Sequence, residues 1–147
     1  MIDIEHIHQS NVEYKDEVIK QAEEAKRYLN SFSWCREITS GSLVRSFGYI
    51  LCIFLFEIEP TKDSGADDKL WVIVGDLPYA YLDIIEYKTP YDALDFYCHL
   101  MEEWIDHVKT GKFLEEYYPV NIQPTLEHAN MLDTRIQLIK HDFLQQV

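Results

Sequence analysis

The sequence predicts an α+β fold, in which one N-terminal helix and two C-terminal helices pack on an antiparallel sheet of three to four strands. Apolar residues recur at spacings of three and four near both ends of the chain, as in amphipathic helices. Between them, residues 34–85 are rich in β-branched and aromatic residues, with turn signals in between. The 147 residues are 47% hydrophobic, which is enough for the core of a single domain spanning residues 1–147, with residues 1–10 expected to be flexible.

The first helix is expected from about Tyr14 to Phe32. Charged residues such as Glu17 and Lys20 fall on one side of this helix. The apolar residues of the other side are Val18, Ala22, Ala25, Leu29 and Phe32. This side is expected to face the sheet.

The strands follow in the β-branched region. The expected order is a strand at Trp34–Thr39, a turn at Ser40–Ser42, a long strand at Leu43–Glu59, a polar loop at Pro60–Asp68, a strand at Lys69–Gly75 and a short edge strand at Tyr79–Ile85. Residues 70–74 are apolar at every position, which is typical of a strand buried on both faces. This strand is therefore expected to be central, with helices on at least one side.

The second helix has the clearest boundaries. Thr89 is a good N-cap, Pro90 suits the first helical position, and Gly111 follows as a stop signal. Its expected inner face holds Leu94, Tyr97, Met101, Trp104 and Val108. The third helix is expected to begin near Pro124 and Thr125 and to run almost to the C-terminus.

The cysteines and the apolar runs indicate a soluble cytoplasmic protein. Cys35, Cys52 and Cys98 are odd in number and widely spaced, which favours a reducing compartment, with all three thiols in the core. The N-terminus has no basic start and no apolar run, so no secretory signal is expected. The longest apolar run, Phe47–Phe56, is shorter than the roughly 20 residues of a membrane helix.

Acidic residues outnumber basic ones by 26 to 13, which gives a net charge of -13. Such an excess repels nucleic acid and anionic membranes, so the expected partner is a basic protein. Residues 91–120 hold seven carboxylates against two lysines. The expected partner-binding residues are Asp92, Asp95, Glu102, Glu103, Asp106, Glu115 and Glu116. The alternative is a solvated helix face that only maintains solubility.

A second function remains open, that of a small metal-dependent hydrolase. His99, Glu103 and His107 are each four residues apart and lie on one stripe of the second helix, a spacing that places two ligands on one metal. The outer two lie about 12 Å apart, so a complete site would need another ligand such as His128 or His141. Asp76, after a buried strand, is a candidate acid or base, although a turn is the favoured interpretation of this segment.

Motifs for other chemistry are absent from the sequence. It contains no Gly-x-Ser-x-Gly elbow and no phosphate-binding glycine-rich loop. We therefore expect no catalytic residues, no metal and no cofactor, and a binding protein rather than an enzyme.

Residues 70–78, 89–104 and 124–135 resemble a small family of uncharacterised bacterial proteins, over roughly the C-terminal half of the chain. The resemblance implies a bacterial, cytoplasmic single domain and assigns no catalytic residue. In size and charge the chain is also similar to the immunity proteins of bacterial toxin systems, including contact-dependent inhibition, which bind and block a toxin domain. The leading hypothesis is therefore an acidic immunity protein that inhibits a basic toxin, for example a nuclease, through protein–protein interaction.

Overall fold

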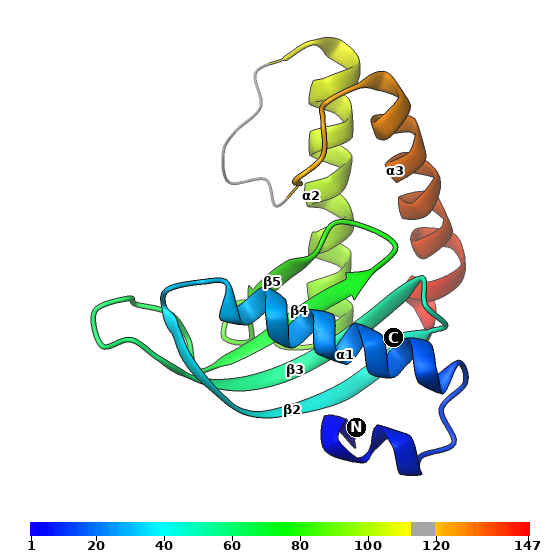
Figure 1. The fold of residues 1–147 in the computed structure, drawn as a ribbon. Helices are drawn as coiled ribbons and strands as arrows, with labels where there is room; N and C mark the ends of the chain where they lie inside the picture. Colours follow the sequence, from blue (N-terminus) through cyan, green and yellow to red (C-terminus); the bar gives the residue numbers. More distant parts are fainter. Residues whose placement is uncertain (113–119) are drawn as a thin grey trace. The chain divides into compact units, whose positions relative to one another are not determined.

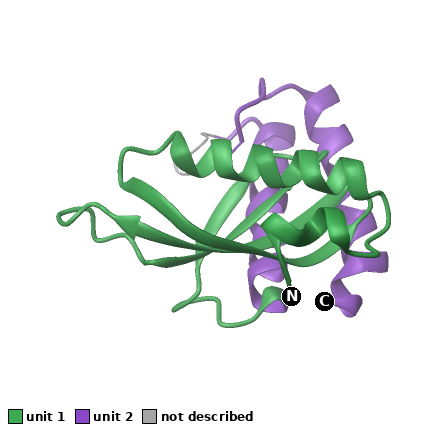
Figure 2. Cartoon of the chain, turned by 60° about the horizontal axis from the view of Figure 1, so that its bottom comes forward, with its two compact units in different colours: residues 1–90 green, residues 91–147 purple. Residues whose placement is uncertain are grey.

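The computed structural model describes residues 1–112 and 120–147. The chain divides into two compact units, residues 1–90 and residues 91–147 (Figure 2). The first unit contains the sheet and the N-terminal helices, and the second contains the C-terminal helices (Figure 1). The α+β class predicted from the sequence is thus confirmed.

Within the described residues, the sheet has five antiparallel strands in the order β1-β2-β3-β4-β5. Their bounds are Ile2–Asp3, Cys35–Phe47, Leu51–Pro60, Lys69–Gly75 and Ala80–Asp83. The prediction of three to four strands missed β1, whose two residues pair with Ser42 and Leu43 of β2. A strand of two residues has no sequence periodicity, so nothing in the pattern could reveal it.

The predicted turn at Ser40–Ser42 is wrong, because β2 runs through it and the first hairpin turns at residues 48–50. Gly41 lies inside the strand, where a Cβ would be 2.6 Å from the Phe56 ring and 2.9 Å from Ile4. This glycine allows close packing and does not make a turn. The turn itself uses Gly48, whose φ of 58° suits glycine.

The hairpin divides the predicted long strand Leu43–Glu59 between β2 and β3. Both strands carry apolar residues up to the turn, so composition did not mark the break. The expected central strand, now β4, pairs with β3 on one side and β5 on the other, and residues 70–74 are all buried.

Helix α1, Lys15–Asn30, covers one face of the sheet (Figure 1). Four of the five residues on the predicted apolar side, Val18, Ala22, Ala25 and Leu29, are buried. The fifth, Phe32, lies beyond the end of α1 and is half-buried. The four buried residues share one core with residues of the sheet and with Ile7 of the short 3-10 helix η1, Ile4–Gln9. Residues 1–10, expected to be flexible, thus form β1 and η1, and Ile7 is fully buried.

The second unit is helical. Helix α2 spans Pro90–Thr110, as its sequence boundaries predict, and Gly111 follows with a φ of 70°. Helix α3 spans Leu126–Leu138, with the Thr125 side chain capping its first turn at the backbone N–H of His128. A π-helical stretch η2, Ile139–Phe143, and a 3-10 turn η3, Leu144–Gln146, complete the chain. In the described ranges, no helix has both the length and the apolar character of a membrane span.

Candidate functional site

The predicted carboxylates of α2 lie along the side of the helix opposite its buried residues. At 100° per residue, positions 92, 95, 102, 103 and 106 fall within an arc of about 100°. Asp92, Glu103 and Asp106 are exposed, while Asp95 and Glu102 are half-buried. Glu115 and Glu116 lie outside the described residues.

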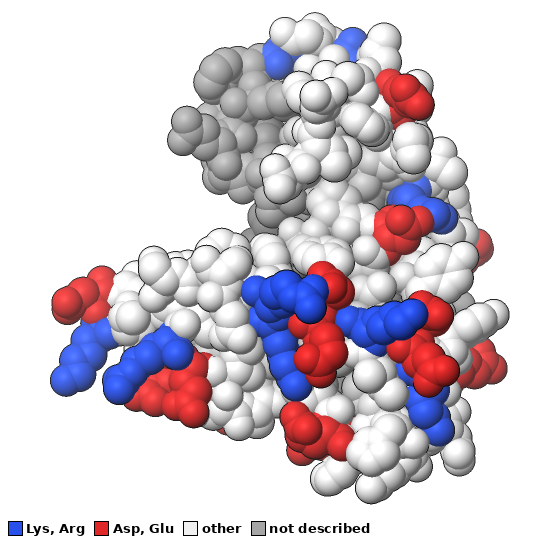
Figure 3. Space-filling model, in the orientation of Figure 1, with Lys and Arg blue, Asp and Glu red and all other residues white. Residues whose placement is uncertain are grey.

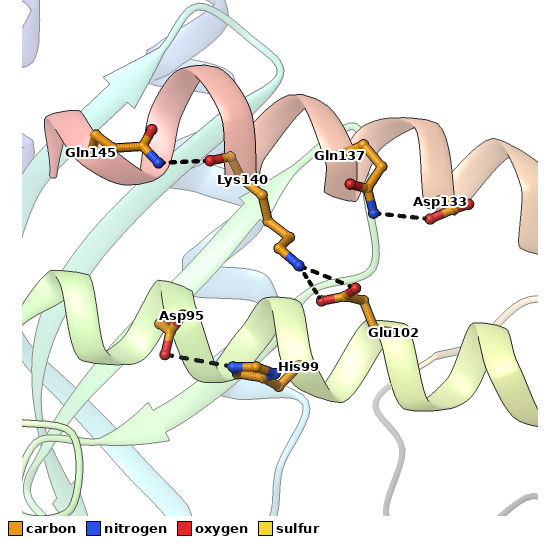
Figure 4. A network of polar contacts seen from close by, with 7 residues as sticks. All are labelled: Asp95, His99, Glu102, Asp133, Gln137, Lys140 and Gln145. Carbon is orange, nitrogen blue, oxygen red and sulfur yellow. Dashed lines mark hydrogen bonds and ion pairs between the residues drawn. The ribbon is translucent and has the colours of Figure 1, made fainter.

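Glu102, at one edge of this arc, is held by a lysine of η2. The Lys140 ammonium donates to both of its carboxylate oxygens, at 3.0 and 3.2 Å (Figure 4). The hydrogen bond and the charge of Glu102 raise the pKa of Lys140. Both side chains are about one third exposed, at 37% for Lys140 and 33% for Glu102. The charge of Glu102 is therefore largely neutralised inside the unit.

The ion pairs of Asp95 and Asp106 are weaker. Asp95 Oδ2 lies 3.7 Å from His99 Nε2, and a histidine is a counter-ion only when protonated. Asp106 Oδ2 lies 3.6 Å from the ammonium of Lys112, and both of those side chains are more than half exposed. Exposed pairs of this kind contribute little free energy, so a partner can replace them.

The wider surface is also of mixed charge. On the face drawn in Figure 3, basic side chains lie next to acidic ones over several elements. In α1, for example, Arg27 binds Glu24 and Lys26 lies 3.4 Å from Glu23. Short-range pairs therefore neutralise several of the carboxylates, whereas no ion pair to Glu103 of the α2 arc is found among the described residues.

The histidine stripe of α2 is present, but the described residues contain no group of three His, Cys, Asp or Glu side chains that could hold a metal ion. His99 is 70% exposed and pairs with Asp95, one turn away on the same helix. The predicted additional ligands are both in the second unit. His128 lies in the first turn of α3, with Nδ1 2.9 Å from the carbonyl oxygen of Gln123, and His141 is exposed in η2.

Asp76 is exposed and directly follows β4. Its backbone N–H donates to the carbonyl of Ile50, 3.1 Å away. At the preceding position, a Cβ on Gly75 would lie 2.1 Å from the same carbonyl oxygen, so only glycine permits this close approach. The segment is thus a chain reversal at the strand end, which is the interpretation that the sequence favoured.

The three cysteines are free thiols in the core, as predicted. Burial raises the pKa of both Cys52 and Cys98 to about 12. It also raises the pKa of Cys35. Since the thiolate is the nucleophile, these thiols are poorly suited to nucleophilic catalysis.

An aromatic cluster on the first unit was not predicted. It consists of five rings from the end of α1, the segment before β2 and the region of β5: Tyr28, Phe32, Trp34, Tyr79 and Tyr81. The sequence shows these residues in two separate segments, and only the packing of α1 on the sheet brings them together.

An open cleft of about 430 Å³ also lies on the first unit, between η1, α1 and β2. It carries both basic and acidic side chains. Lys26 lies 3.5 Å from Glu5 across it, and Arg36 binds Glu59 at 3.2 Å. Both cations are paired with glutamates of the same unit. Lys26 and Arg36 therefore give the cleft no unpaired positive charge that could bind an anionic ligand.

Comparisons with protein-family models, with curated proteins and with solved structures found no match.

Proposed function

We propose that this chain is a protein-binding module that binds a basic partner protein, and specifically an immunity protein that blocks a basic toxin domain such as a nuclease. The observation that supports the proposal is the exposed acidic arc of α2, in which Glu103 and Asp106 face solvent. A nuclease must present lysine and arginine to phosphate. An acidic surface can therefore cover the same groups and exclude the substrate.

The carboxylates of the arc differ in how strongly a cation of the same chain binds them. Glu102 is bound through both oxygens to Lys140, so a partner must break that pair to use it. Asp95, Glu103 and Asp106 have weak ion pairs or none that is found among the described residues. These three residues are the ones that we expect to contribute most to association.

Long-range attraction between opposite charges accelerates association and weakens as salt screens it. The test uses toxin domains encoded in the same genome, each purified with an inactivating substitution, and isothermal titration at low and high salt. We expect one basic domain to bind in a 1:1 complex, with affinity falling at least about tenfold between roughly 50 and 300 mM salt.

The triple variant Asp95→Lys, Glu103→Lys and Asp106→Lys is expected to lose binding by about two orders of magnitude at low salt. The control variant Glu13→Lys, Glu37→Lys and Asp142→Lys makes the same change in net charge at exposed positions outside the arc. It is expected to retain most of the affinity. Equal affinity of the two triple variants would contradict the role of the arc.

A further inference from the structure

The aromatic cluster of the first unit is a continuous ring surface. At its centre, the ring centroids of Phe32, Trp34 and Tyr81 lie 4.9 to 5.1 Å from one another. Tyr28 joins this centre at 5.1 Å from Phe32, and Tyr79 lies 5.8 Å from Tyr28. Five rings from two segments of the chain are thus in contact.

These rings are not fully buried. Tyr81 is 39% exposed, and the other four are half-buried at the edge of the core. A contiguous patch of large aromatic side chains on the surface of a folded unit is typical of an interaction site. Aromatic residues also supply much of the binding energy at the centres of protein interfaces.

Two carboxylates, Asp83 and Asp67, lie near the end of β5, the strand that carries Tyr81. Asp83 follows Tyr81 by two positions on β5, so both side chains point to the same face of the sheet. Asp83 also interacts with Asp67. The pKa of Asp67 is raised by its partial burial, by the charge and hydrogen bonding of Asp83 and by the charge of Asp68. Negative charge is therefore concentrated at the end of the strand that carries Tyr81.

Two arginines of the neighbouring elements have exposed ion-pair partners in the same unit. Arg27 of α1 binds Glu24, and Arg36 of β2 binds Glu59. A cation from another molecule could contact the exposed part of the Tyr81 ring and the carboxylates of this region. A guanidinium suits such a surface better than an ammonium, since its planar group stacks on an aromatic ring while its N–H groups donate to a carboxylate.

We propose that the aromatic cluster is a docking surface for the basic partner, and that an arginine of the partner stacks on Tyr81 and Trp34 with its guanidinium directed toward Asp83. The proposal rests on the proposed function for the nature of the partner. It adds a second contact surface, on the unit that does not carry the acidic arc. Stacking on the rings supplies selectivity for arginine over lysine, which the acidic arc alone does not provide.

The test needs no identified partner. The probes are two peptides of equal charge, acetyl-(Gly-Arg)₃-amide and acetyl-(Gly-Lys)₃-amide, titrated into the full chain while aromatic carbon and proton shifts are recorded by NMR. We expect the arginine peptide to shift the ring signals of Trp34 and Tyr81 and to bind at least about threefold more tightly than the lysine peptide.

Tyr81→Leu keeps an apolar side chain but removes the ring, and is expected to abolish the preference for arginine. Tyr49→Leu changes a tyrosine that is 50% exposed outside the cluster and is expected to preserve that preference. Asp67→Asn provides a second variant that leaves all the rings in place, and it is expected to weaken both peptides. Thermal melts establish that each variant is folded.

Equal binding of the two peptides, or shifts confined to α2, would overturn the docking proposal. Ring shifts that depend on protein concentration in the absence of peptide would assign the cluster to self-association and would also overturn it. Failure of the proposed function is distinguishable, since the cluster would then bind the arginine peptide while no toxin domain binds the chain.

Discussion

The ammonium of Lys140 donates to both carboxylate oxygens of Glu102, and a second ion pair, Lys109 with Asp133 at 3.4 Å, lies seven residues away on each helix. One pair places the lysine after α3, and the other places it on α2. From the first pair to the second, the residue number rises along α2 and falls from η2 into α3. The two pairs therefore hold α2 antiparallel to α3 and η2 (Figure 4). Glu102 therefore has a structural role as well as a place in the acidic arc.

Replacing Lys140 by methionine is expected to lower the free energy of unfolding by about 0.5–1 kcal/mol at pH 7, since the pair is partly exposed and screened. The pKa of Lys140 is raised in the folded state, so the stabilisation is fully present below the unfolded lysine pKa of about 10.4. It is lost as pH rises through the folded-state pKa. Urea unfolding at pH 7 and above pH 11 measures both effects.

The control is Lys109→Met, because Lys109 approaches Asp133 through a single oxygen. Its effect at pH 7 is expected to be smaller than that of Lys140→Met. The prediction fails if Lys140→Met leaves the free energy of unfolding unchanged, or if both variants lower it equally. In either case the two-oxygen contact would contribute no more than an ordinary surface pair.

Gly41→Ala is expected to destabilise the first unit by about 1–3 kcal/mol, because the added methyl group meets the Phe56 ring inside a packed core. Chemical denaturation followed by circular dichroism measures the loss. Ser40→Ala, at the adjacent exposed position, is expected to stay within about 0.5 kcal/mol of the parent. A tolerated Gly41→Ala would contradict the close packing of Phe56 and Ile4 against this position.

Asp67→Asn is expected to stabilise the protein at pH 7. Because the pKa of Asp67 is raised by partial burial and by Asp83, the folded state binds this proton more tightly than the unfolded state. Ionisation then costs stability as pH rises above the unfolded value of about 3.9. The gain at pH 7 is expected to be at most about 1 kcal/mol and to vanish near pH 3.

Urea unfolding of parent and variant at the two pH values tests this prediction about Asp67. Asp63→Asn removes an exposed carboxylate from the same loop and is the control. If Asp67→Asn destabilises the folded protein at pH 7, the folded state favours the ionised form of Asp67. The inferred unfavourable interaction between the Asp67 and Asp83 carboxylates would then be wrong.

The cysteines are expected to resist alkylation while the protein is folded. Burial raises the pKa of Cys52 and Cys98 to about 12, so little thiolate is present and the sulfur atoms are inaccessible. Iodoacetamide followed by mass spectrometry is expected to label all three cysteines in concentrated guanidinium chloride. In the folded protein, Cys35 should react first, since it retains 7% exposure. Rapid labelling of Cys52 or Cys98 would contradict their burial.

Local signals in the sequence predicted the helices well. Thr89, Pro90 and Gly111 bound α2 because capping and stop signals act within one turn. The position of the first hairpin was predicted wrongly, since Gly41 and Gly48 look alike in sequence and differ in backbone conformation and in what packs against them. Distinguishing them requires knowing where Phe56 lies.

The candidate surfaces depend even more on tertiary structure. Sequence identified the carboxylates of α2, but Lys140, 38 positions from Glu102, could not be assigned as its partner. The aromatic cluster likewise joins Phe32 and Tyr81 across a strand-rich region. Pairs so distant in the chain leave no periodic signal in the sequence.

The most direct test of the proposed function is inhibition. A basic toxin domain from the same genome is assayed on its nucleic-acid substrate while this chain is titrated against it. The account predicts that cleavage stops at one equivalent of the chain, and that the variant with Asp95, Glu103 and Asp106 replaced by lysine requires a large excess. Full toxin activity at every ratio, for every basic toxin domain of that genome, would contradict it.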